Sequence, residues 1–257
     1  MSGFSAEWLA LREPADTVAR SEAVVAYVGQ RVQGRLLDLG GGTGANIRYL
    51  SPRLPTPQHW MIVDDDAALL GHAPPGVTRR HTDLNQVVDD DDLFRECGLV
   101  TASALLDLVS ESWLKRLIDR CSEVKAGVLF ALTYDGRTAC QPVELEDDEV
   151  TRLVNEHQRR DKGFGAALGP AAAARAIELL AAAGYEVKQE RSDWQLGPAD
   201  PELQRQLIEG WTHAASEGRS ERAAVFADWR NRRLAHVDAA RSRIVVGHVD
   251  LAGIRRA

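Results

Sequence analysis

The sequence predicts a single α/β domain, with helices covering both faces of a mostly parallel sheet. Apolar, strand-like segments alternate with helix-like segments along most of the 257 residues, without a repeat or an obvious linker. The segment 126–134 is almost wholly apolar, which is typical of a strand buried on both faces of a parallel sheet. Together these patterns indicate a doubly wound fold with one continuous core.

Composition limits the classes of function. Hydrophobic residues make up 44% of the chain and charged residues 27%, which is an ordinary balance for a globular protein. The net charge of −7 disfavours a nucleic-acid partner, because phosphate binding requires a basic face. Cys97, Cys121 and Cys140 are too scattered for a disulfide framework or a metal site. No segment approaches the roughly 20 apolar residues of a membrane span, so we expect a cytoplasmic monomer or homodimer without a membrane partner.

The expected elements follow in order along the chain. Seven strands are expected over 36–39, 58–63, 77–81, 98–103, 126–134, 185–194 and 242–251. A short helix over 5–11 should end before Pro14, and Asp16 should cap a second helix that Gly34 closes. Further helices are expected over 45–50 and 171–183, and a short one is expected to end at Leu70. Four more are expected to begin at Ser110, Asp147, Pro201 and Ser220. The chain thus divides into an N-terminal helical cover (1–33), a core (35–135), a lid-like segment (136–170) and a helical insertion (197–241) before the last strand.

The segment from Arg35 to Asn46 carries the clearest functional pattern. An apolar strand runs into the loop Gly40-Gly-Gly-Thr-Gly44, and a short helix follows. Glycine has no Cβ, so such a loop can turn tightly and bring backbone N–H groups close to a ligand. Strand, glycine loop and helix in this order are typical of a nucleotide-type site in an α/β sheet.

Two nucleotide ligands fit this loop. Gly40, Gly42 and Ala45 match the relaxed dinucleotide fingerprint, which keeps NAD open. Asp38, however, lies inside the strand two residues before the first glycine. A carboxylate there would repel a pyrophosphate and suits a ligand that carries an ammonium group or another cation.

The spacing from Leu36 to Gly44 resembles the first motif of class I S-adenosylmethionine-dependent methyltransferases. The resemblance covers about residues 35–135 and implies a Rossmann-like methyltransferase fold with a seven-stranded sheet, S-adenosylmethionine as methyl donor and S-adenosylhomocysteine as product. It places Asp64, with Asp65 able to share the role, on the two ribose hydroxyls. It also implies that three segments contact the cofactor: the first motif, the end of the third strand and the end of the fourth strand. The residues of these segments are Asp38, Gly40, Gly42, Gly44, Asn46, Asp83, Leu84, Ala102 and Ser103.

The N-terminal helix and the later segments supply candidates for the rest of the site. Similar enzymes fold their N-terminal helix over the cofactor, so Arg12 is expected to meet the methionine carboxylate. The candidates for acid–base chemistry come from the end of the fifth strand and from the polar segment 157–165; they are Tyr134, Asp135 and His157. Candidates for the acceptor pocket are Trp8, Lys162, Phe164, Trp194 and Trp211. Core packing is an alternative for Trp211, and an exposed helical position is one for His157.

These observations favour methyl transfer to an O or N atom of a small molecule. The fourth strand continues as Ala102-Ser-Ala-Leu105 and lacks the Asn/Asp-Pro-Pro-aromatic motif of enzymes that methylate nucleobase amino groups. No His/Asp/Glu set shows metal-ligand spacing, so no metal is expected. Three alternatives stay open: a nicotinamide-dependent oxidoreductase, a non-catalytic S-adenosylmethionine-binding module, and a protein or nucleic-acid methyltransferase.

Overall fold

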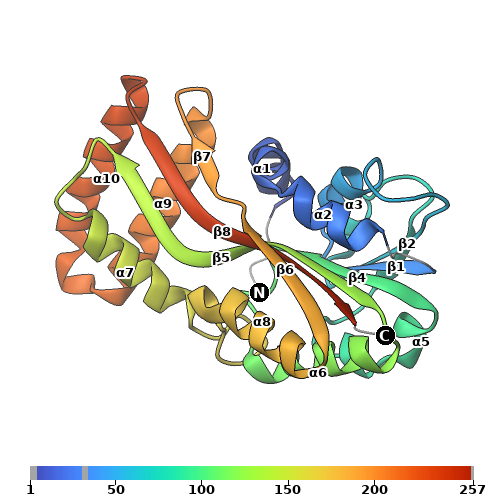
Figure 1. Cartoon of the computed structure of the whole chain (residues 1–257). Helices are drawn as coiled ribbons and strands as arrows, with labels where there is room; N and C mark the ends of the chain where they lie inside the picture. The colour runs from blue at the N-terminus through green and yellow to red at the C-terminus, as the bar shows by residue number, and fades with distance from the viewer. Residues whose placement is uncertain (1–4, 31–33, 256–257) are drawn as a thin grey trace.

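A central sheet organises the computed structural model, which describes residues 5–30 and 34–255 (Figure 1). The strands are Arg35–Leu39 (β1), His59–Asp64 (β2), Thr78–His81 (β3), Cys97–Ser103 (β4), Gly127–Gln141 (β5), Tyr185–Arg191 (β6), Trp194–Leu196 (β7) and Arg243–Arg255 (β8). They are ordered β3-β2-β1-β4-β5-β8-β6, and β7 also pairs with β8. β1 to β5 pair in parallel, whereas β8 is antiparallel to its three partners. The predicted doubly wound α/β fold is confirmed.

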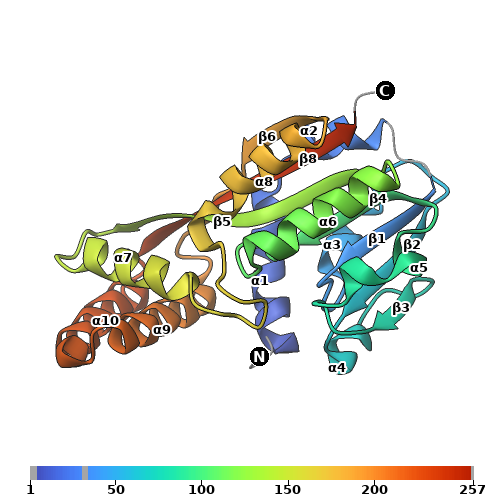
Figure 2. The same ribbon diagram turned by 90° about the horizontal axis from the view of Figure 1, so that it is seen from below.

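Helices cover both faces of this sheet, as Figure 2 shows from below. The α-helices are Ala6–Ala19 (α1), Glu22–Gly29 (α2), Ala45–Leu50 (α3), Ala67–Leu70 (α4), Asp91–Phe94 (α5), Glu111–Glu123 (α6), Asp147–Gln158 (α7), Ala172–Ala182 (α8), Pro201–Gly218 (α9) and Ala223–Asp238 (α10). Side chains alternate between the faces of a strand, so Leu36 packs with α2 and α3 while Leu37 packs with α6 and α8. The sheet is therefore apolar on both sides, and its polar groups gather at the strand ends.

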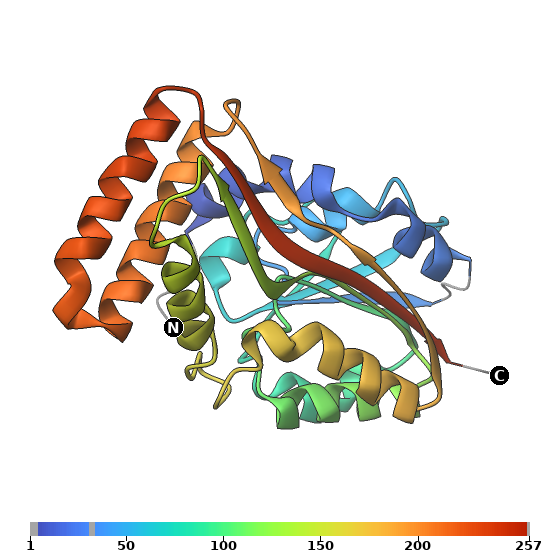
Figure 3. The ribbon, with the colours of Figure 1, turned by 60° about the vertical axis from the view of Figure 1, so that its left-hand side comes forward.

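β5 is longer than the sequence predicts. It was expected to end at Tyr134 but continues to Gln141, because β8 pairs with it as far as Arg243. The pairing is interrupted near Leu132, whose φ is 51° and whose N–H donates to the buried carboxylate of Asp250 at 2.8 Å. Such a bulge bends a strand. Beyond the bend, α7, α9 and α10 lie side by side against the extended pair (Figure 3).

The edge strand expected over 185–194 is split. β6 and β7 both pair with β8, and Ser192 and Asp193 lie between them. The carboxylate of Asp193 accepts hydrogen bonds from Arg137 and from the backbone N–H of His248. Between the two strands, Ser192 N–H still donates to the His248 carbonyl at 3.0 Å, and the Asp193 side chain accepts from the His248 N–H. The split gives eight strands where seven were expected.

The N-terminal helices differ from the prediction. α1 continues through Pro14 to Ala19, so the helix does not end there. Asp16 does not cap the next helix, because its carboxylate accepts from Arg12 and from the Trp194 indole. Ser21 caps α2 instead. α2 ends at Gly29, and residues 1–4 and 31–33 of the expected cover lie outside the described residues.

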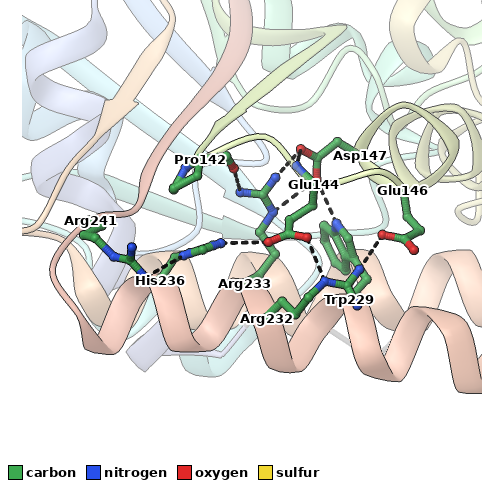
Figure 4. A network of polar contacts seen from close by, with 9 residues as sticks. All are labelled: Pro142, Glu144, Glu146, Asp147, Trp229, Arg232, Arg233, His236 and Arg241. Carbon is green, nitrogen blue, oxygen red and sulfur yellow. Dashed lines mark hydrogen bonds and ion pairs between the residues drawn. The ribbon is translucent and has the colours of Figure 1, made fainter.

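A buried ion pair joins α10 to the first residue of α7 (Figure 4). The Arg233 side chain is fully buried; it donates to both carboxylate oxygens of Asp147 and to the carbonyl of Pro142. The Trp229 indole donates to the same carboxylate at 2.8 Å. Arg232, one residue away, forms ion pairs at the more exposed rim. The two helices of the insertion are thus held to the extended sheet by a directional polar contact as well as by apolar packing.

Candidate functional site

The glycine loop after β1 admits no larger residue at several positions. Gly40, Gly42 and Gly44 have φ values of 61°, 54° and 81°, which L-residues rarely adopt. A Cβ on Gly41 would lie 2.5 Å from Ile62, and one on Gly44 would lie 2.5 Å from Pro74. The backbone therefore approaches its surroundings closely at this turn, as a ligand cradle requires.

A cavity of about 450 Å³ opens beside this loop, at the carboxyl ends of β1, β2 and β4. This edge, where β1 and β4 are neighbours, is the place where open α/β sheets bind ligands. α1 and the segment around Phe164 close the cavity from outside. The predicted residues on its wall are Arg12, Gly40, Gly42, Asn46, Asp64, Asp65, Leu84, Ser103 and Phe164.

Asp64 is the buried carboxylate of the wall. One of its oxygens accepts from Gly42 N–H at 2.8 Å, and the other accepts from Asp66 N–H at 2.9 Å. Burial raises the pKa of Asp64, and these two hydrogen bonds act in the opposite direction. Each carboxylate oxygen can accept a second hydrogen bond, so Asp64 retains acceptor capacity toward the cavity. Asp65 also lines the cavity, and Asp66 caps α4.

Asp38 lies behind the wall. It is fully buried, and its Oδ1 accepts from Asn46 Nδ2 at 2.6 Å and from the Thr101 hydroxyl at 2.7 Å. Burial raises its pKa to about 6. The sequence predicted that Asp38 would face a cationic ligand; its position allows it to act only through Asn46, which reaches the cavity.

Arg20 is a site residue that the sequence reasoning missed. Its Nη1 donates to Asn46 Oδ1 at 2.9 Å, and its Nε pairs with buried Asp250 at 3.3 Å. Its Nη2 has no hydrogen-bond partner among the described residues. A small hollow next to the main cavity is lined by Arg20, Asn46 and Ser103. Nothing in the local pattern around Arg20 indicates this, because its partner Asp250 is 230 residues away.

Arg12, the cation that the sequence assigned to the cofactor, is already paired. Its guanidinium donates to both oxygens of Asp16 at 2.9 and 3.1 Å and lies 5.0 Å from the centre of the Trp194 ring. Arg12 does line the cavity, but its charge is largely neutralised there. Trp194 itself is buried behind it and also contacts His248.

The three candidates for acid–base chemistry are not among the described residues of the cavity wall. Tyr134 donates its hydroxyl hydrogen to Asn155 at 2.7 Å, and burial raises its pKa. Asp135 is paired with Arg137. His157 lies 3.2 Å from Glu217, and burial lowers its pKa. Each of them has a structural partner, so the geometry gives no role in catalysis to any of the three.

The acceptor candidates separate in space. Phe164 lines the cavity and packs edge-on against Trp113, with ring centres 5.5 Å apart. Lys162 Nζ lies 3.4 Å from the His157 ring. Trp8 and Trp211 pack against the apolar cluster of α7, α9 and α10, away from the wall. For Trp211 this is the core packing that the sequence analysis gave as the alternative to a place in the acceptor pocket.

Three further predicted residues lie around the cavity and not on its wall. Asp83 is exposed, and its Oδ1 accepts from Asn85 N–H at 2.9 Å, which is the geometry of a turn. Gly44 faces Pro74, and Ala102 is buried within β4. Leu84, next to Asp83, does reach the cavity.

The described residues also bear on metal binding and on membrane insertion. No group of three or more His, Cys, Asp or Glu side chains in 5–30 and 34–255 is arranged to hold a metal ion. Within the same ranges, no helix has the length and apolar character needed to cross a bilayer.

Solved structures with this fold share little sequence with the chain. A cyclopropane-fatty-acyl-phospholipid synthase-like protein from Lactobacillus casei is 15% identical, with a TM-score of 0.54 over 97% of this chain and 94% of that one. A sugar N-methyltransferase, KedS8, from Streptoalloteichus is 18% identical, with a TM-score of 0.47 over 74% and 87%. A phosphoethanolamine N-methyltransferase from Haemonchus contortus, in complex with S-adenosylhomocysteine, is 15% identical, with a TM-score of 0.46. The match to the Haemonchus protein covers 91% of this chain but only 52% of the Haemonchus chain.

The strand order and the first of these similarities establish the fold, which is that of class I S-adenosylmethionine-dependent methyltransferases. No protein-family model matches the sequence. No curated protein matches it either.

Proposed function

We propose that this chain transfers a methyl group from S-adenosylmethionine to an oxygen or nitrogen atom of a small molecule. The observation that carries the proposal is the position of Asp64. Its buried carboxylate stands at the end of β2, bonded to the glycine loop and open to a cavity of about 450 Å³. A carboxylate held in this way suits the two hydroxyls of a ribose, since it accepts two hydrogen bonds in fixed directions.

The rest of the cavity provides for the other parts of the donor. Leu69 and Leu84 supply apolar wall for the adenine ring. Arg20 lines a small hollow with Asn46 and Ser103, and its Nη2 has no hydrogen-bond partner among the described residues. A charge-assisted hydrogen bond to the amino-acid carboxylate of the donor would supply that partner. In this proposal Arg20 takes the role that the sequence gave to Arg12.

The chain's contribution to the reaction is orientation and exclusion of water. The sulfonium supplies an already activated methyl group, so no nucleophile or metal is required from the protein. Leu9 of α1, Leu105 and Phe164 form an apolar boundary around the space beyond the glycine loop. Holding two reactants in line within such a boundary can lower the barrier by several kcal/mol.

The charge of the cavity disfavours the nicotinamide alternative. Its wall carries three consecutive carboxylates, Asp64 to Asp66, and the Arg12 cation is paired with Asp16. A pyrophosphate placed against this wall would meet like charge without a free cation. A sulfonium carries the opposite charge and fits the same field.

Calorimetric titrations with S-adenosylhomocysteine and with NAD test the proposal directly. S-adenosylhomocysteine should bind, and NAD should bind at least tenfold more weakly. Binding of NAD alone would overturn the proposal.

The three consecutive aspartates offer matched variants. Asp64→Asn should weaken S-adenosylhomocysteine binding about tenfold, roughly 1.4 kcal/mol, because it replaces one acceptor oxygen with an amide. Asp66→Asn is the control: it removes the same charge but retains a good helix cap. Asp65→Asn shows whether Asp65 also binds the ribose hydroxyls. Equal losses in all three variants would mean that only charge matters and that the ribose assignment is wrong.

A second ligand separates the two ends of the site. 5′-Methylthioadenosine has the ribose and adenine but lacks the amino-acid part. Asp64→Asn should weaken both ligands, whereas Arg20→Lys should weaken only S-adenosylhomocysteine. A loss of both ligands in Arg20→Lys would assign Arg20 a structural role alone.

A further inference from the structure

α1 has two different faces. Leu9, Arg12 and Asp16 line the cavity, and their spacing of three and four residues puts them on one side of the helix. The other side packs against the apolar cluster of α7, α9 and α10, through Trp8, Leu11, Ala15 and Ala19. α1 is thus supported from behind, and Arg12 and Asp16 are the polar side chains that it brings to the cavity.

The guanidinium of Arg12 is fixed on one edge and on one face. Its Nε and Nη2 donate to the two carboxylate oxygens of Asp16 at 2.9 and 3.1 Å. Its central carbon lies 5.0 Å from the centre of the Trp194 ring, and the Trp194 indole itself donates to Asp16 at 2.9 Å. These three side chains hold one another in place, so little side-chain freedom remains to be lost when a ligand binds to Arg12.

Nη1 is the part of Arg12 that remains available to a ligand. It has no hydrogen-bond partner among the described residues, and unlike the Nη2 of Arg20 it is not a buried atom. The Arg12 side chain is 12% exposed and lines the cavity, so we expect the Nη1 hydrogens to face the cavity. Nη1 carries N–H donors and no acceptor, so it binds an oxygen or nitrogen lone pair of a ligand.

The charge of Arg12 acts on the side of the cavity that follows β4. Asp107 belongs to the segment 104–108, several residues of which line the cavity. Burial raises the pKa of Asp107, and the charge of Arg12 opposes this shift. Arg20 opposes in the same way the shift of Asp38, behind the glycine loop. Electrostatic interactions weaken with distance, so Arg12 and Arg20 serve different parts of the cavity.

The surroundings of Arg12 favour a neutral oxygen that only accepts hydrogen bonds. Leu105, Leu108 and Phe164 make the wall on this side apolar. Asp16 neutralises Arg12, so an anionic ligand would meet that carboxylate without a compensating charge. Asp16 already accepts from three N–H groups, which makes it a poor partner for a ligand group that must also donate. A carbonyl oxygen only accepts, and its hydrogen bond from a guanidinium is charge-assisted.

We propose that Arg12 determines the specificity for the methyl acceptor, by donating from Nη1 to a neutral carbonyl oxygen of a largely apolar molecule. This inference rests on the proposed methyl transfer and adds the chemical class of the molecule that is methylated. Arg12 binds and orients that molecule, and it takes no part in bond formation.

Matched pairs of a ketone and a hydrocarbon test this class on the protein loaded with S-adenosylhomocysteine. Acetophenone and ethylbenzene form one pair, 1-indanone and indane form the second, and ligand-observed NMR titration measures their dissociation constants. In at least one pair the ketone should bind at least tenfold more tightly than the hydrocarbon. Equal binding within both pairs, or no binding of any member, would overturn the inference. Benzoate should bind more weakly than acetophenone, and tighter binding of benzoate would mean that the site takes an anion instead.

Two arginines that pair with carboxylates of α1 provide the variant and its control. Arg12→Met removes the donor from the cavity wall and should reduce the affinity for the ketones to that for the hydrocarbons. Arg48 donates to both oxygens of Glu13 at 2.7 and 2.6 Å but does not line the cavity. Arg48→Met should therefore leave the preference for ketones unchanged. An unchanged preference in Arg12→Met, or equal losses in the two variants, would refute the role of Arg12.

Donor binding is measured first in each protein, with S-adenosylhomocysteine and with 5′-methylthioadenosine. Both ligands should bind to Arg12→Met as tightly as to the wild type. A loss of S-adenosylhomocysteine alone would place Arg12 on the amino-acid part of the donor and overturn the inference. Absence of S-adenosylhomocysteine binding to the wild type would instead refute the proposed methyl transfer. The comparison of ketones with hydrocarbons on the wild type tests the class of the methyl acceptor even where Arg12→Met fails to fold.

Discussion

The Arg233–Asp147 pair allows a quantitative test of how the helical insertion is held. The Arg233 side chain is fully buried, and the Asp147 side chain is 15% exposed. Removing one partner of a buried pair costs about 3–5 kcal/mol, because the other charge stays buried without compensation. Asp147 retains hydrogen bonds from the Trp229 indole and from Glu144 N–H, so the lower value applies. Arg233→Ala should therefore lower the free energy of unfolding by about 3 kcal/mol.

The neighbouring Arg232 provides the control. It forms ion pairs with Glu144 and Glu146, but its side chain is 40% exposed, so water screens the interaction. Arg232→Ala should cost less than about 1 kcal/mol. Urea unfolding followed by far-UV circular dichroism measures both, and the Arg233→Ala melting temperature should fall by about 6–12 °C. Equal losses in the two variants would refute the argument that burial decides the energy of these pairs. None of these residues lines the cavity, so binding of S-adenosylhomocysteine should persist in both.

Two further predictions concern the glycine loop and the carboxylate behind it. Gly42→Ala places a Cβ 3.0 Å from Leu9 at a φ of 54°, and it should weaken S-adenosylhomocysteine binding at least tenfold in calorimetry. Gly76→Ala is the control, because Gly76 has a φ of 80° but lies in open space. It should destabilise the fold about as much as Gly42→Ala and leave binding unchanged. Asp38 has a pKa of about 6 against an ordinary 3.8, so the native state binds more protons between these values and stability falls as pH rises from 4 to 6. Asp38→Asn should remove about 2 kcal/mol of that fall, measured as the difference between wild-type and variant unfolding free energies at pH 4 and 6; parallel curves would refute it.

Part of the cavity wall could be predicted from the sequence, because the pattern of the proposed donor site is local. The glycine loop, Asp64 and Leu84 each follow a strand within a few residues, and parallel strands bring their carboxyl ends to one edge. Once the strands are recognised, the juxtaposition follows without knowledge of side-chain packing. The same reasoning found the helices of the insertion, whose apolar stripes and caps are also local.

Other residues on and around the cavity depend on contacts between distant segments. Asp16 was predicted to be a helix cap, but its carboxylate accepts a hydrogen bond from the indole of Trp194, 178 residues later. Arg20 donates to Asn46 on the cavity wall and is held there by Asp250, 230 residues away. Tyr134, Asp135 and His157 were chosen because they lie near the expected strand ends or in the polar segment that follows. Tyr134 and His157 have partners far away in the sequence, Asn155 and Glu217. The partner of Asp135 is only two residues away, but Arg137 also pairs with distant Asp193.

The two sides of the cavity are held in different ways, and this bears on how a ligand enters. α1 is anchored by buried groups, since Asp16 holds Trp194 and the Arg20–Asp250 pair joins its end to β8. The segment around Phe164 is held by an edge-on contact with Trp113 and by an exposed hydrogen bond from Asn85 to Gly163. Breaking exposed contacts costs far less than separating a buried ion pair. We therefore expect the Phe164 side of the wall to yield at smaller cost than α1, which in the proposed function is the fixed surface for the donor.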